Sequence, residues 1–356
     1  MRVVYGRNVN ETYAIGVNAL AHEHEIQDSR VGEVLVMPTP VTTVYQYPEE
    51  RVLFNAKRDA NPFFHLMEGL WMLAGRNDVE WITFFNSKFD QFSDNGETFN
   101  AAYGYRWRQQ FKRDQLTELV TMLENEPNTR RAVISMWDPY ADFNKEGKDF
   151  PCNLNIAFRI RDKKLTMTVF NRSNDIIWGA YGANAVHMSM LQEYIASSLN
   201  IEMGAYTQVS NDYHAYTNVL DKIGIPDPHP MDPYDMGDVN PFPMLTSSRV
   251  EWEKRLSLFM EDSSIYIRLG YKQSYKFDPG FIEEPFFAEI VIPMLRAWGC
   301  YKHKDHARAI DIVTNSMPNN CDWKVACRAW LVRKAERYAT RNSQKRLKSQ
   351  KVAHDN

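Results

Sequence analysis

Residues 150–175 read FPCNLNIAFRIRDKKLTMTVFNRSND, and this stretch decides the fold class. Apolar and polar side chains alternate in LNIAFRI (154–160) and again in LTMTVF (165–170), and the charged segment RDKK (161–164) separates the two runs. This pattern is typical of a β-hairpin. Strands that pair in sequence order favour an antiparallel or mixed sheet.

Helical patterns lie on both sides of this hairpin. Residues 61–75, NPFFHLMEGLWMLAG, carry apolar side chains at helical spacing and end at Gly75, which predicts a buried helix with a glycine cap. Glu68 lies inside that stretch, either at the rim of the helix or buried because chemistry uses it. A helix is also predicted over 184–199, where one stripe consists of Ala185, Met188, Gln192, Ile195 and Leu199. With a strand predicted over RRAVISMW (130–137), the fold class is α+β, a mixed β-sheet packed by helices.

We expect three parts along the chain. Residues 1–225 form the core, and residues 226–245 hold six prolines, which predicts an irregular connection. Residues 246–356 are expected to complete the core and to add a C-terminal helical extension of unknown role. SIYIRLGYK (264–272) is strand-like there, and helices are predicted near 282–298 and 321–341. The basic run from Arg328 to Lys351 is either a solvated helix face or a weak contact for an anion.

Composition limits the class of protein. The 356 residues are 44% hydrophobic and 24% charged, and the net charge of −3 does not suggest a protein that coats nucleic acid. The first residues lack the apolar core of a signal peptide, and no run of about 18 apolar residues is present, so we expect a cytoplasmic protein. The four cysteines contain no CxxC pair, and no set of metal ligands is apparent.

Cys152 and Arg172 flank the predicted hairpin and should lie close together. An arginine near a thiol favours the thiolate and lowers its pKa, as a nucleophilic cysteine requires. Arg172 and Ser173 also supply donors suited to a phosphate. Arg130 and Arg131 are adjacent at the start of a predicted strand, so their side chains point to opposite faces and would not serve one site in one subunit.

Seven short motifs, in order, resemble thymidylate synthase and its relatives, the pyrimidine-nucleotide hydroxymethylases. The resemblance runs from about Ser29 to Tyr216, a little over half of the chain. The motifs are DSRVGEV (28–34), EGLWMLAG (68–75), AAYGYRW (101–107), NTRRAVISMW (128–137), FPCN (150–153), NRSND (171–175) and SNDYHAY (210–216). The resemblance implies a thymidylate synthase-like catalytic core.

The resemblance also implies roles for individual residues. Cys152 is the nucleophile that adds to C6 of a pyrimidine nucleotide, and Glu68 handles protons through ordered water. The cosubstrate is 5,10-methylenetetrahydrofolate, whose one-carbon unit is attacked by C5. The other implied positions are Tyr103 beside the cysteine, Arg30, Arg172 and Ser173 at the phosphate, His214 and Tyr216 at the sugar 3′-hydroxyl, and Asp175 at the pterin. The family's homodimer would place Arg130 and Arg131 at the phosphate in the partner's site.

The sequence departs from the synthases at several of these positions. Phe89 and Phe92 occupy the positions of two tryptophans that enclose the exocyclic methylene in the folate site, and the chain ends KVAHDN after a long extension. Asn153 replaces the histidine that usually follows the cysteine, and Asn171 replaces a glutamine in the nucleotide site. These changes favour addition of water over dry hydride transfer, because water exclusion protects such intermediates. Hydroxymethylation is therefore favoured over the alternative, reductive methylation by a thymidylate synthase.

The choice of base depends on one position. The synthases read uracil with an asparagine, and deoxycytidylate hydroxymethylases place an aspartate there, because a carboxylate accepts from cytosine N4. Ungapped counting from Asp175 gives Ala183, and a shift of one residue gives Asn184. The absence of aspartate favours dUMP over dCMP. A further alternative is a non-catalytic nucleotide-binding or RNA-binding homologue that uses the basic C-terminal run; nucleic acid is otherwise not an expected partner.

Overall fold

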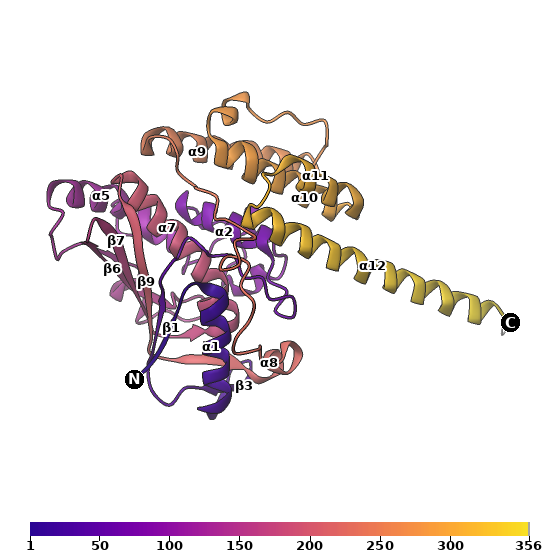
Figure 1. Ribbon diagram of the computed structural model, residues 1–356, viewed down its shortest axis with the longest axis horizontal. Coiled ribbons are helices and arrows are strands. Elements are labelled where there is room, and N and C mark those ends of the chain that lie inside the picture. Colours follow the sequence, from indigo (N-terminus) through magenta and orange to yellow (C-terminus); the bar gives the residue numbers. More distant parts are fainter. Residues whose placement is uncertain (355–356) are drawn as a thin grey trace.

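A six-stranded mixed sheet lies at one side of the molecule, and helices pack against it (Figure 1). The computed structural model describes residues 1–354, with side-chain detail for residues 1–281 and 283–344. The strand order is β1 (Arg2–Gly6), β4 (Val41–Tyr45), β9 (Glu202–Ser210), β7 (Lys164–Asn171), β6 (Asn153–Arg161) and β5 (Val133–Ser135). With helices packed on it, the sheet confirms the α+β class.

The predicted hairpin is present as β6 and β7, which pair antiparallel. Asp162 and Lys163 connect them, both with positive φ, 50° and 61°. Two left-handed residues give a turn whose twist matches that of the strands, so the hairpin closes tightly. Its open end places Asn153 directly opposite Asn171. The strand predicted over 130–137 is shorter, because only Val133–Ser135 pairs with β6.

A second sheet of four strands adjoins the open end of this hairpin. Its order is β2 (Glu25–Ser29), β3 (Gly32–Val36), β10 (Tyr213–Tyr216) and β8 (Asn174–Asp175). β7 is followed by β8 after two residues, and β9 is followed by β10 after two residues. The two sheets are therefore joined where the sequence places its site residues.

Two helices connect the large sheet to the rest of the core. α7 (Asn184–Ser198) is buried over nearly its whole circumference, and Gln192 donates from Nε2 to the carbonyls of Leu165 and Gly204, where the β7–β9 register shifts. α2 (Pro62–Leu73) packs on α7. Asn61 caps its first turn, and Gly75, with φ 70°, follows its end as predicted.

The remaining elements of the first 225 residues are helical, and all of them except α1 (Val9–His22) and α5 (Gln115–Asn125) are short. The short ones are α3 (Val79–Thr83), η1 (Phe89–Phe92), α4 (Tyr103–Tyr105), η2 (Arg106–Gln110), α6 (Pro139–Asp142), η3 (Ile176–Ala183) and α8 (Thr217–Ile223).

The C-terminal part is helical. It contains α9 (Arg249–Arg268), η4 (Pro279–Glu283), η5 (Phe286–Val291), α10 (Ile292–Lys302), α11 (His306–Ser316) and α12 (Asp322–His354). The strand predicted over 264–272 is therefore wrong, because those residues end α9 and enter a turn. Ser248 caps this helix, and Trp252, Leu256 and Phe259 bury one face of it, so the longer helical period outweighs the β-branched pair near its end.

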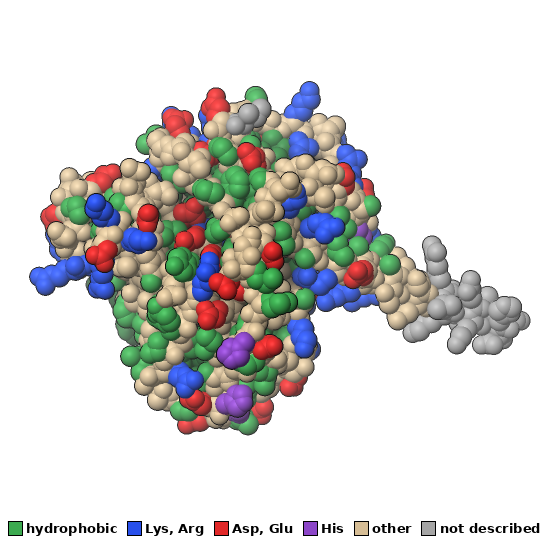
Figure 2. Space-filling model, viewed as in Figure 1, with side chains coloured by type: hydrophobic (Ala, Val, Ile, Leu, Met, Phe, Trp, Pro, Cys, Tyr) green, Lys and Arg blue, Asp and Glu red, His purple; other side chains and the backbone are tan. Residues whose placement is uncertain are grey.

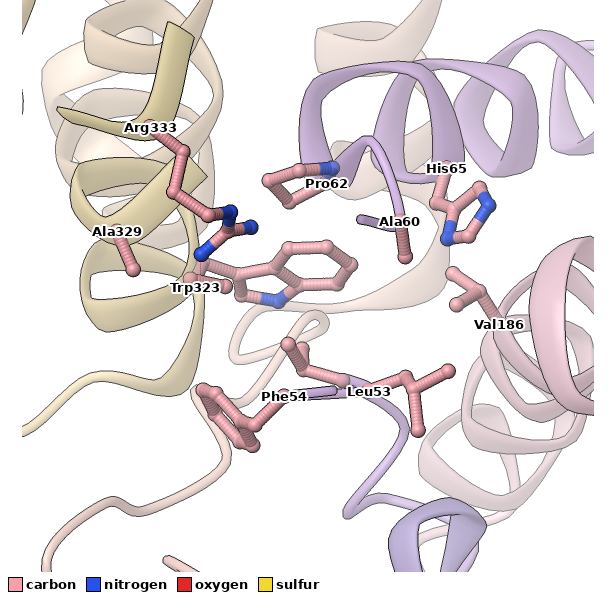
Figure 3. Close-up of a pocket in the computed structure, with 11 residues that line it drawn as sticks. Leu53, Phe54, Ala60, Pro62, His65, Val186, Trp323, Ala329 and Arg333 are labelled. Carbon is pink, nitrogen blue, oxygen red and sulfur yellow. The ribbon is translucent and has the colours of Figure 1, made fainter. Parts of the chain in front are cut away.

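α12 is anchored to the core at its first turns and then extends beyond the body (Figure 1). Arg333, Lys334 and Arg337 all pair with Asp59, at 3.2, 2.6 and 2.7 Å. Figure 2 shows Lys and Arg side chains grouped where the helix leaves the body. Figure 3 shows Trp323 of α12 facing Pro62 of α2 across a small cavity. In the described residues, no helix combines the length and the apolar character needed to cross a bilayer.

Candidate active site

Cys152 and Arg172 lie together at the open end of the β6–β7 hairpin. The sulfur of the half-buried Cys152 is 3.9 Å from Nη2 of Arg172. Arg172 also donates from Nε to the carbonyl of Pro151 and from its backbone N–H to the carbonyl of Cys152, both at 2.9 Å. These bonds fix the guanidinium beside the thiol, as the sequence predicted.

The protonation of Cys152 differs from the expectation. Burial raises the pKa of the thiol above its ordinary value, and Asp175 and Asp212 act in the same direction. Arg172 lowers the pKa, but it does not outweigh the burial. The lowering effect predicted for the arginine is therefore present, but burial outweighs it, and the net shift of the thiol pKa is upward. An additional cation or hydrogen-bond donor is needed to favour the thiolate.

Asn153 and Asn171 face one another across the hairpin, and both are buried. Among the described residues, neither side-chain amide has a hydrogen-bond partner. Buried amides usually have partners, because an unpaired buried polar group costs about 1–3 kcal/mol. Their free donors and acceptors therefore favour a polar ligand beside Cys152.

A buried acid and a buried histidine lie on the helices that support the hairpin. Glu68, on α2, is only 3% exposed. It is therefore buried and does not lie at the exposed rim of the helix. Its Oε2 atom is 3.7 Å from Nδ1 of His187 on α7. Sequence reasoning missed His187, because a histidine in an apolar helix carries no signal of what it faces.

Tyr103 lies next to both this pair and Cys152. Its ring packs edge-on against His187, with 5.7 Å between centroids. Burial raises the pKa of Tyr103, Cys152 raises it further, and the backbone groups of Asn153 and Cys152 oppose the shift. Tyr103 therefore lies between the cysteine and the Glu68–His187 pair. The adjacent Gly104 holds α4 against α2, because a Cβ atom there would lie 1.9 Å from the carbonyl oxygen of Met72.

The second sheet carries residues predicted to bind the nucleotide, His214 and Tyr216, and one predicted to bind the folate, Asp175. Asp175 on β8 and His214 on β10 are paired in register. Burial opposes the charged form of His214, but Asp212, 2.5 Å from its Nδ1, and Asp175 outweigh it and raise the pKa of the imidazole. Burial also raises the pKa of Tyr216, an effect that Asp175 and Cys152 reinforce and that Ser29 and Arg30 oppose. These influences place Tyr216 near both Cys152 and the exposed β2–β3 turn that holds Arg30.

Asp175 ends β8 and also caps the helical segment that follows, η3. Its Oδ1 accepts from the backbone N–H groups of Ile177 and Trp178, at 2.8 and 3.0 Å, and so caps η3. Burial raises the pKa of this carboxyl, and the two N–H groups and His214 oppose that shift. Beside it, the guanidinium of Arg58 lies 4.3 Å from the ring centre of the exposed Trp178. Arg58 and Trp178 are two further residues that the sequence reasoning did not identify.

η3 bears on the choice between Ala183 and Asn184. The chain is kinked within it, because Tyr181 and Gly182 have non-helical φ/ψ, so ungapped helical counting does not hold across this segment. Asn184 is buried directly after it, and its Nδ2 donates to Oδ1 of Asn174 at 3.1 Å. Ala183 is only half-buried. The inward side chain at this point is therefore that of Asn184.

The remaining predicted residues differ in their exposure. Phe89 packs between Phe64 and Phe99, whereas Phe92 is 52% exposed. Ser173 is half-buried at the link between the sheets. Arg130 and Arg131 precede β5 and are exposed, and Arg131 pairs with Glu126 at 2.9 Å.

An α+β fold that presents a cysteine beside an arginine, with a buried carboxylate nearby, has the groups that an enzyme using covalent catalysis by a cysteine requires. A family model described as thymidylate synthase matches residues 19–225. The chain belongs to the thymidylate synthase family.

Individual relatives narrow the comparison. The chain is 43% identical over 355 residues to a protein of Pseudomonas phage M6 named deoxyuridylate hydroxymethyltransferase, covering 96% of this chain and 97% of that one. A protein of Bacillus phage SP01 with the same name is 39% identical over 52% of this chain and 50% of its own. A putative thymidylate synthase of Methanothermobacter thermautotrophicus is 32% identical over 44% of this chain and 71% of its own.

Proposed function

We propose that this protein transfers a one-carbon unit from 5,10-methylenetetrahydrofolate to C5 of dUMP and adds water, which gives 5-hydroxymethyl-dUMP. One observation carries the proposal most directly: the 43% identity to the phage M6 hydroxymethyltransferase covers 96% of the chain. That match includes the C-terminal helices, which the family match over 19–225 does not reach.

In this reaction Cys152 supplies the nucleophile. Its thiolate forms a bond to C6 of uracil, and C5 becomes nucleophilic and attacks the one-carbon unit. Loss of the C5 proton and of tetrahydrofolate leaves a methylene group outside the ring. Water adds to that group, and C6 then releases the thiolate. Glu68, buried behind Tyr103, handles protons in this sequence through ordered water.

The residues predicted to bind the nucleotide surround the cysteine. Arg30, Arg172 and Ser173 would hold the 5′-phosphate, while His214 and Tyr216 hold the sugar hydroxyl. The raised pKa of His214 keeps a proton available for such a hydrogen bond. The exposed Phe92 and the Asp175–Trp178 region would lie on the folate side of the site.

The arginine pair would act in the partner subunit of a homodimer. Val133 is 48% and Phe170 38% exposed, on the face of the large sheet opposite the one that α7 covers. Exposed apolar side chains on a sheet face are a feature of surfaces that another protein covers. A second copy on this face would bring Arg130 and Arg131 to the neighbouring phosphate.

Base selection would rest on Asn184. Its Nδ2 already donates to Asn174, so its Oδ1 can accept the N3–H of uracil. Aspartate at this position would instead favour the amino group of cytosine. We therefore expect Asn184→Asp to lower the rate with dUMP and to raise the rate with dCMP, with product formation from each nucleotide as the measurement.

The decisive assay is incubation with dUMP and methylenetetrahydrofolate, followed by mass analysis of the nucleotide and absorbance detection of dihydrofolate. We expect 5-hydroxymethyl-dUMP and no dihydrofolate, and Cys152→Ala should give neither product. Thymidylate formed together with dihydrofolate would establish the methylating alternative. Absence of turnover by the wild-type protein, together with nucleotide binding that is unchanged in Cys152→Ala, would establish a non-catalytic nucleotide-binding role.

A further inference from the structure

The buried polar atoms behind Cys152 are unusually short of partners. Oε2 of Glu68 and both ring nitrogens of His187 are buried without a hydrogen-bond partner in the described part of the chain. The pair is 3.7 Å apart, which is too long for a direct hydrogen bond. Both residues are nearly inaccessible to solvent, with 3% and 2% exposure. Unpaired atoms at this depth are usually bridged by ordered water.

The Glu68–His187 pair offers a proton acceptor, which the amide of Asn153 does not. An amide binds water but does not accept a proton at neutral pH, and Asn153 stands where a histidine usually follows the nucleophile in the synthases. His187 supplies an imidazole from α7 instead, edge-on to Tyr103, which itself borders Cys152 and Asn153. The imidazole and the carboxylate therefore lie on the same side of Tyr103.

We propose that His187, together with Glu68, binds the water that adds to the exocyclic methylene and accepts its proton. This inference rests on the proposed hydroxymethylation. The water oxygen forms a bond to the methylene carbon, and the π electrons of the methylene shift through C5 onto the C4 oxygen. The water proton passes to His187. The enolate then re-forms the C5–C6 double bond and expels the thiolate of Cys152, which can take up that proton.

The inference separates two observable steps. Loss of the C5 hydrogen precedes water addition, so it does not require His187. Release of tritium from dUMP labelled at C5 reports the earlier step, and 5-hydroxymethyl-dUMP reports the later one. A stalled methylene is an electrophile that an added thiol captures as a thioether.

His187→Gln keeps a polar side chain of similar reach but cannot accept the proton. We expect its rate of product formation to fall about 100-fold, in the range usual for loss of a general base, while tritium release falls much less. Added thiol should yield a nucleotide thioether in this variant. The matched control is His65→Gln on α2, a buried histidine that lines the cavity beneath α12 (Figure 3). That control should keep the wild-type ratio of product to tritium.

Parallel loss of tritium release and product in His187→Gln, at unchanged folding, would overturn the inference. Wild-type rates of both tritium release and product formation in this variant would overturn it as well. If His187→Gln does not fold, a high-resolution structure of the wild-type protein decides, since absence of an ordered water on either ring nitrogen also overturns it. The proposed function fails separately, if the wild-type protein makes no 5-hydroxymethyl-dUMP.

Discussion

Arg172 holds its guanidinium 3.9 Å from the sulfur of Cys152, and the two residues flank the same hairpin. The contact is built into the local fold, because the Asp162–Lys163 turn fixes the strand register. It counters, without cancelling, the effect of burial on the thiol. We therefore expect a further cation, such as the arginine pair of a partner subunit, to be needed for thiolate formation at Cys152.

Removal of Arg172 should make the thiol still harder to ionise. The thiolate is the reactive form, so its alkylation rate rises as the pH passes through the pKa. In Arg172→Gln we expect the midpoint of this rise to move to higher pH by about one unit, a shift typical of losing one nearby opposite charge. The measurement is the rate of iodoacetamide labelling of Cys152 against pH, by mass spectrometry. A midpoint that stays or moves lower would contradict the contact.

Trp323 should account for much of the attachment of α12. Its side chain is 2% exposed and faces α2 across the cavity of Figure 3. We expect Trp323→Ala to lower the free energy of unfolding by about 3 kcal/mol, as is usual for a buried tryptophan. Arg341→Ala, on the exposed part of the same helix, should change it by less than about 0.5 kcal/mol. Urea denaturation measures both, and equal effects would show that Trp323 does not anchor the helix.

Gly104 tests the contact that sets the position of Tyr103. A methyl group at residue 104 would collide with the backbone of Met72, on the helix that carries Glu68. Gly104→Ala should therefore destabilise the protein by about 1–3 kcal/mol through overpacking. At a temperature where the variant is folded, we also expect a lower turnover number, because Tyr103 and α2 move apart. Wild-type stability and turnover would show that α4 adapts without cost.

The sequence was sufficient to predict the hairpin, α2 and the Cys152–Arg172 contact. All three follow from local periodicity or from the geometry of a single turn. α9 was predicted incorrectly near its end, because Ile265 and Ile267 suggest a strand, whereas the buried stripe of the helix begins thirteen residues earlier, at Trp252. The nine residues 264–272, taken alone, do not include the buried face of the helix.

Features of the site that depend on packing could not be predicted. The pairing of His187 with Glu68 requires α7 to lie on α2, and the raised pKa of Cys152 requires the depth of burial. The greater burial of Asn184 compared with Ala183 follows a kink at Tyr181 and Gly182 that sequence counting does not reveal. In each case a tertiary arrangement, rather than a local pattern, decides which atom faces the site.

The central claim is that the sulfur of residue 152 bonds to the pyrimidine ring during turnover. The most direct test uses 5-fluoro-dUMP with methylenetetrahydrofolate, because fluorine cannot leave C5 as a cation and the covalent complex should persist. Peptide mapping by mass spectrometry should find nucleotide and folate attached to Cys152 and not to the buried Cys300, Cys321 or Cys327. Absence of an adduct from a folded protein that binds dUMP, or an adduct on another cysteine, would contradict the mechanism.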